Sequence, residues 1–145
     1  MNKENNVCRS LTLQNEVDQL SQLAPFVWAF AEEAQLDEQP AMQLDLALDE
    51  AVTNVVLYAY PKGTGGEVTV AAKREGDTLE VVLTDSGTPF DPTAQEDPDL
   101  TLSADERPIG GLGIFLVRQM MDTVRYERKD GKNILTLRKN LASNG

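Results

Sequence analysis

The sequence contains no histidine and a single cysteine, Cys8, among its 145 residues. Without histidine the chain cannot carry a Ser-His-Asp triad, a histidine-based zinc site or a phospho-accepting histidine. One cysteine excludes an intrachain disulfide and a cluster of thiolate metal ligands. Because no run of about 18 apolar residues occurs, we expect no membrane-spanning helix and no membrane partner.

Basic residues are also few, with 13 Lys and Arg against 24 Asp and Glu, for a net charge of −11. This balance argues against direct binding of nucleic acid, which needs clustered Lys and Arg. Small anions are not excluded, since backbone N–H groups and a metal ion can hold them. Residues 2–6 are polar and no apolar signal region follows them, so a cytoplasmic location is expected.

The length and the residue pattern predict one α+β domain over residues 1–145. Apolar alternation predicts short strands, and apolar residues at helical spacing predict amphipathic helices. The strands are expected at 7–13, 67–73, 78–84, 123–128 and 133–139, and the helices at 16–35, from about 40 to 60, and at 112–121. Hairpins occur where a parallel fold needs crossovers, so we expect a two-layer sandwich: a mostly antiparallel mixed sheet with helices on one face.

Glu50 and Asn54 are polar residues inside a strongly apolar helical segment. Four residues apart, they lie on one face of the helix, one turn apart. Burial of an unpaired polar group costs roughly 2–7 kcal/mol, so a metal ion, water or ligand is the expected partner. Carboxylate and amide oxygens suit Mg²⁺. Taken alone, the pair fits a solvated stripe equally well.

Asp85-Ser86-Gly87 directly follows the strand predicted at 78–84. An aspartate at a strand end can accept a hydrogen bond from an exocyclic amine, and a nearby glycine lets a flat ligand approach the backbone. An ordinary Asx turn explains the same three residues and is favoured when they are considered alone.

Gly110-Gly111-Leu112-Gly113 opens the last predicted helix. Glycines at this point expose N–H groups at the positive end of the helix, which suits phosphate. A loose helix start is the alternative, and the segment is neither a Walker loop nor a Rossmann fingerprint. The polar, acidic segment before it is long for a loop inside a compact domain.

In this order the segments resemble the GHKL (Bergerat-fold) ATP-binding domains over nearly the whole chain. Glu50 to Asn54 is similar to the N box, Asp85 to Phe90 to the first glycine box, and Gly111 to Gly113 to the second. Residues 92–110 are the expected ATP lid. The strings Asp49-Glu50-Ala51-Val52-Thr53-Asn54 and Pro89-Phe90-Asp91 most resemble the RsbW/SpoIIAB-type anti-sigma-factor serine-protein kinases.

The resemblance implies a role for each matching residue. Asn54 would ligate Mg²⁺ on the ATP phosphates, Glu50 would activate a serine hydroxyl, and Asp85 would accept from the adenine amine. Arg107, in the lid, would reach the γ-phosphate. The implied nucleotide-binding set is Asn54, Asp85, Gly87, Pro89, Phe90, Arg107, Gly110, Gly111, Leu112 and Gly113.

The implied function is an ATP-dependent serine-protein kinase of a bacterial partner-switching system, acting on a STAS-domain antagonist. A sigma factor or another regulated target would be the second partner, and a homodimer is possible. The alternative is an ATP-binding module that sequesters a partner without phosphotransfer. The catalytic domain of a sensor histidine kinase is disfavoured, because the chain has no histidine and no dimerisation helices.

Overall fold

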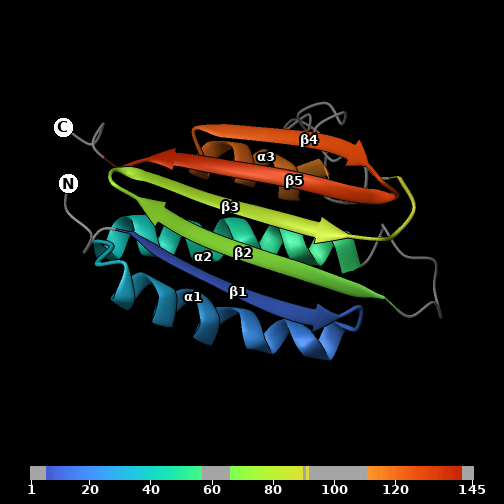
Figure 1. The fold of residues 1–145 in the computed structure, drawn as a ribbon, viewed down its shortest axis with the longest axis horizontal. Helices are drawn as coiled ribbons and strands as arrows, with labels where there is room; N and C mark the ends of the chain where they lie inside the picture. The colour runs from blue at the N-terminus through green and yellow to red at the C-terminus, as the bar shows by residue number, and fades with distance from the viewer. Residues whose placement is uncertain (1–5, 57–65, 90, 92–110, 142–145) are drawn as a thin grey trace.

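The computed structural model describes residues 6–56, 66–89, 91 and 111–141; at residues 17 and 111–115 only the backbone is described. Five strands form one sheet in the order β1-β2-β3-β5-β4, and every pairing in it is antiparallel. The helices lie together behind this sheet (Figure 1). The elements are β1 (Val7–Gln14), the 3₁₀ helix η2 (Val17–Gln22), α1 (Leu23–Glu33), α2 (Glu38–Asn54), β2 (Glu67–Glu75), β3 (Thr78–Asp85), α3 (Gly111–Met120), β4 (Thr123–Lys129) and β5 (Lys132–Asn140).

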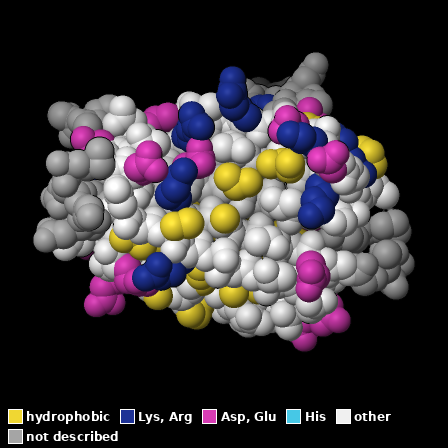
Figure 2. Space-filling model, in the orientation of Figure 1, with side chains coloured by type: hydrophobic (Ala, Val, Ile, Leu, Met, Phe, Trp, Pro, Cys, Tyr) yellow, Lys and Arg dark blue, Asp and Glu magenta, His cyan; other side chains and the backbone are white. Residues whose placement is uncertain are grey.

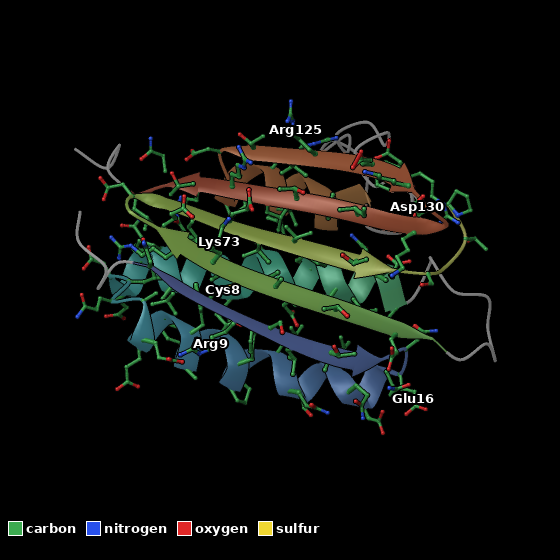
Figure 3. All side chains as sticks on the ribbon, viewed as in Figure 1. Cys8, Arg9, Glu16, Lys73, Arg125 and Asp130 are labelled. Carbon is green, nitrogen blue, oxygen red and sulfur yellow. The ribbon has the colours of Figure 1, made fainter. Side chains whose placement is uncertain are left out.

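The described helices cover one face of the sheet. Buried and partly exposed residues alternate along β2, β3 and β5, which is the pattern of a sheet with one packed face. Cys8 of β1, Lys73 of β2 and Arg125 of β4 lie on the open face (Figure 3). Charged side chains of both signs surround a small hydrophobic centre there (Figure 2).

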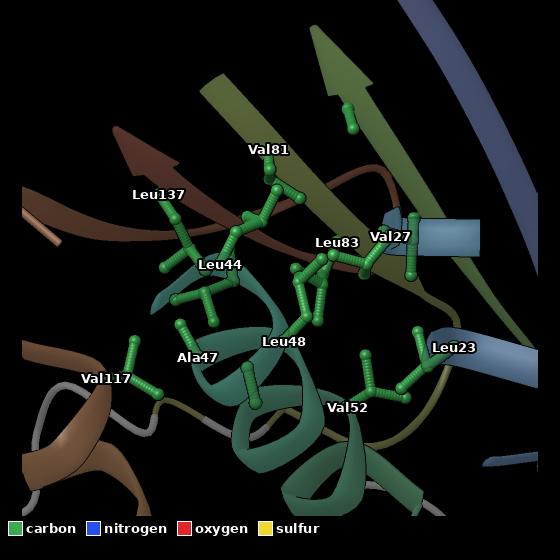
Figure 4. Close-up of a cluster of buried hydrophobic side chains, with 14 of the residues drawn as sticks. Leu23, Val27, Leu44, Ala47, Leu48, Val52, Val81, Leu83, Val117 and Leu137 are labelled. Atoms are coloured by element: carbon green, nitrogen blue, oxygen red, sulfur yellow. The ribbon is translucent and has the colours of Figure 1, made fainter. Parts of the chain in front are cut away.

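The core lies between the covered face and α2. Leu44, Leu48 and Val52 are fully buried at the spacing of one helical face, and they pack toward Val81, Leu83 and Leu137 of the sheet (Figure 4). Leu23 and Val27 of α1 and Val117 of α3 close the core at its sides. The predicted two-layer fold class is therefore confirmed.

The helix predicted over residues 16–35 is wrong in its first turns, which form the 3₁₀ helix η2 before α1 begins at Leu23. Pro25 explains the break, because proline has no N–H and its ring clashes with the carbonyl four residues earlier. With α1 starting at Leu23, Pro25 falls in the first turn, where N–H groups have no partner within the helix.

The β4–β5 turn is formed by Asp130 and Gly131, with φ of 53° and 76°. Both residues are left-handed, as a two-residue hairpin turn requires. The turn sets the register in which Arg128 of β4 pairs with Asn133 of β5. None of the described helices has the length and apolar character needed to cross a bilayer.

Candidate functional site

Three of the predicted segments meet at one end of the molecule, which we call the polar end and define by Asn54, Asp85 and the backbone of Gly111. The C-terminal end of α2, the C-terminal end of β3 and the start of α3 lie together there (Figure 1). Hydrogen bonds fix this arrangement: Lys139 Nζ donates to Met120 O at 3.1 Å. Lys139 and Asn133 lie near opposite ends of β5, so this hydrogen bond holds the C-terminal end of α3 away from Asn133. The N-terminal end of α3 is therefore directed toward Asn133 and its partner Asp85.

Glu50 and Asn54 lie on the side of α2 that faces α3. They share a stripe with Ala47 and Ala51, since the four positions follow i, i+3, i+4, i+7 spacing, and Ala47 faces Val117 of α3 (Figure 4). The two alanines, both buried, let α3 approach closely. The polar pair is therefore carried toward the N-terminal half of α3 rather than into solvent.

Burial changes the chemistry of both side chains. It raises the pKa of the half-buried Glu50 carboxyl, and the neighbouring Asp49 carboxylate raises that pKa further. Asn54 is only 6% exposed, and no described residue hydrogen-bonds its side chain. A polar ligand or an ion can therefore pair with this amide. The pair fits a hard cation that takes an oxygen from Asn54 and completes its shell with water and phosphate.

Asp85 is the last residue of β3 and is 4% exposed. Its Oδ1 accepts from Gly87 N–H at 2.9 Å and from Asn133 Nδ2 at 2.9 Å. Among the described residues, these are the two hydrogen bonds to this carboxylate, and both are accepted by Oδ1. Oδ2 can therefore accept a hydrogen bond from a ligand. Gly87 is buried beside it, and Pro89 is exposed.

The start of α3 supplies backbone donors. Gly111, Leu112 and Gly113 form its first turn, and the first N–H groups of a helix have no acceptor within it. The helix dipole adds partial positive charge at this point. The predicted lid at 92–110, with Arg107 and Gly110, lies outside the described residues, as does Phe90.

The sequence interpretation missed Asn133, Tyr126 and Arg128. Asn133 is 4% exposed and holds both Asp85 and the carbonyl of Thr88, the latter at 2.8 Å. Tyr126 Oη and Arg128 donate to Asn133, and Arg128 also donates to Gly87 O at 2.8 Å. One signal was available: Asn133 interrupts the apolar positions of its strand on the covered face.

The sequence profile of the histidine kinase-like ATPase domain matches residues 13–139. The chain belongs to this family. The predicted GHKL resemblance is thus confirmed, and membership implies that this ATPase-family domain binds ATP. The roles of individual residues remain predictions.

Several curated serine kinases are similar to this histidine kinase-like ATPase domain. The serine/threonine-protein kinase BtrW of Bordetella bronchiseptica is 34% identical over 94 residues, which cover 65% of this chain and 66% of BtrW. The serine-protein kinase RsbW of Listeria monocytogenes is 35% identical over 96 residues, covering 63% of this chain and 61% of RsbW. The matched segment is therefore less than two thirds of either relative.

Solved structures share the fold. The RsbU and RsbW domains of Rv1364c from Mycobacterium tuberculosis superpose with a TM-score of 0.67 at 18% identity, covering 93% of this chain and 32% of that one. The catalytic domain of the histidine kinase ThkA gives 0.52 at 12% identity, covering 93% of this chain and 97% of that one. At these identities the likeness is one of architecture.

Proposed function

We propose that this histidine kinase-like ATPase domain is an ATP-dependent serine-protein kinase of a bacterial partner-switching system. Its substrate would be a STAS-type antagonist protein, and it would bind a sigma factor or similar target in alternation with that antagonist. Residues 1–145 would form one ATPase domain with a lid at 92–110. The similarity to serine-protein kinases at 34–35% identity supports this choice.

The observation that carries the proposal is the place of Glu50. Its carboxyl has a raised pKa and lies one turn from the buried Asn54, whose side chain no described residue hydrogen-bonds. A base acts best when its pKa approaches the working pH. Glu50 would accept the proton of the partner's serine as the serine oxygen bonds to the γ-phosphorus. The bond from that phosphorus to the bridging oxygen of ADP would break at the same time.

The remaining residues would position the nucleotide. Asp85 Oδ2 would accept from the adenine amine, Gly87 would let the base pack, and the first N–H groups of α3 would bind phosphate. Asn54 would hold Mg²⁺, which neutralises phosphate charge when bound. The nucleotide-binding roles predicted from the sequence are also proposed for Pro89, Phe90, Arg107 and Gly110. A cytoplasmic location belongs to the same proposal.

The test is phosphotransfer from γ-labelled ATP to a purified STAS-domain antagonist protein. We expect phosphoserine on that protein with the wild type, and a loss of at least about 100-fold in rate with Glu50→Gln at unchanged ATP affinity. Full transfer by Glu50→Gln would contradict the assignment of the base. ATP-dependent binding of the partner without any phosphoserine would instead support the sequestering module.

A further inference from the structure

The side chain of Asn133 is held at both ends of its amide. Nδ2 donates to Asp85 Oδ1 at 2.9 Å and to Thr88 O at 2.8 Å. Oδ1 accepts from Tyr126 Oη and, at 3.2 Å, from Arg128. The two donors and two acceptor positions of the amide are all used, so Asn133 connects Asp85 to two side chains of β4.

Arg128 decides which way this amide points. A guanidinium can only donate, so the atom facing it must be the oxygen of Asn133. The amide nitrogen then faces Asp85 Oδ1 and Thr88 O, and both of these oxygens are hydrogen-bond acceptors. The orientation is thus dictated by chemistry, and Tyr126 reinforces it.

The consequence for Asp85 is an asymmetric carboxylate. Oδ1 already accepts from Gly87 N–H and Asn133 Nδ2, while no described residue hydrogen-bonds Oδ2. A free carboxylate can accept two parallel hydrogen bonds, one on each oxygen. Held in this way, Asp85 offers a ligand one good acceptor.

We propose that the Asn133–Tyr126–Arg128 network makes Asp85 select adenine over guanine. Adenine needs only one acceptor for its exocyclic amine, and Oδ2 supplies it. Guanine presents two adjacent donors on its pairing edge, N1–H and the N2 amine, which match a carboxylate with both oxygens available. With Oδ1 occupied, one of guanine's donors would be buried without a partner. This inference rests on the proposed nucleotide site at Asp85.

Calorimetric titration of the full chain with Mg-ADP and Mg-GDP tests the proposal. We expect the wild type to bind ADP about tenfold or more tightly than GDP. Asn133→Ala opens one acceptor position on Oδ1, which keeps only the hydrogen bond from Gly87 N–H. ADP affinity should then fall while GDP affinity holds or rises, and the GDP-to-ADP ratio of Kd should drop about tenfold. Tyr126→Phe loosens the amide without touching Asp85, and the ratio should drop about threefold.

Thr136→Ala is the matched control, because Thr136 lies on the same strand but on the open face. Its Kd ratio should equal that of the wild type. The inference would be overturned if Asn133→Ala lowered the affinities for ADP and GDP equally, or if Tyr126→Phe left the ratio of the two Kd values unchanged. Either result would show that the network has only a structural role, and the proposed function would stand. Should Asn133→Ala not fold, Tyr126→Phe decides. A wild type that binds neither nucleotide would overturn the proposed function as well.

Discussion

Glu50 shows at the scale of one residue how burial changes the titration of a side chain. The raised pKa of its carboxyl means that the native state holds a proton that the unfolded chain has already released. Between the usual glutamate pKa and the raised one, the free energy of unfolding therefore falls as pH rises. The position is unfavourable for stability at neutral pH, which is common for residues kept for function.

Replacing Glu50 with Gln should remove this loss. We expect Glu50→Gln to melt at the same temperature as the wild type near about pH 4, and at a higher temperature at about pH 8. Thermal unfolding followed by circular dichroism across this range measures the difference. Glu127→Gln, at an exposed position of β4, controls for the removal of one carboxylate. A difference that does not grow with pH would contradict the burial account.

Asn54 should show the same conflict between stability and function. Asn54→Leu replaces a buried amide that lacks a described partner, so without nucleotide the free energy of unfolding should rise by about 1 kcal/mol. The same variant should lose any effect of Mg²⁺ on ADP affinity, which titration with and without the metal measures. Retained magnesium dependence would remove Asn54 as the ligand.

The sequence predicted Glu50 and Asn54 because they are polar residues inside an apolar helical segment, and Asp85 because it directly follows a strand and precedes a glycine. Asn133, Tyr126 and Arg128 were not predicted, since their roles depend on contacts made between strands. Asn133 and Asp85 lie 48 residues apart. Only the antiparallel register of β3 and β5 brings them together, and apolar periodicity does not determine that register.

At the scale of elements, the central helix α2 connects the core to the site. One side of it packs on the sheet, while the stripe that carries Glu50 and Asn54 faces α3. Most element positions followed from alternation and helical spacing, with the break at Pro25 as the exception. Around Pro25 the apolar spacing continues without a break, but one α-helix cannot run through this segment because the proline ring clashes with the preceding turn.

Two leucines of α2 test this division of its faces. Leu48 is fully buried and lies close to Leu83 (Figure 4), whereas Leu46 is 48% exposed. Leu48→Ala should reduce the free energy of unfolding by about 2–5 kcal/mol, and Leu46→Ala by less than about 0.5 kcal/mol. Urea denaturation measures both. Similar losses at the two positions would contradict the packing of α2 on the sheet.

At the scale of the whole molecule, the fold places the ends of three elements at one end of a two-layer sandwich. The sheet and α2 enclose one hydrophobic core, and Asp85 is the last residue of β3. The net charge of −11 would repel a nucleotide at long range. Under the proposed function, binding would depend on local groups: Oδ2 of Asp85, the N–H groups of α3 and a metal at Asn54.

Titration of Asp85→Asn with Mg-ADP tests this account most directly. The amide oxygen can still accept from Gly87 and Asn133, so the fold is preserved, but an NH₂ group replaces Oδ2 and faces the donor of adenine. We predict a loss of about 100-fold in affinity relative to the wild type, with an unchanged circular dichroism spectrum. Equal ADP affinity in Asp85→Asn and the wild type would contradict the assignment of this end as the nucleotide site.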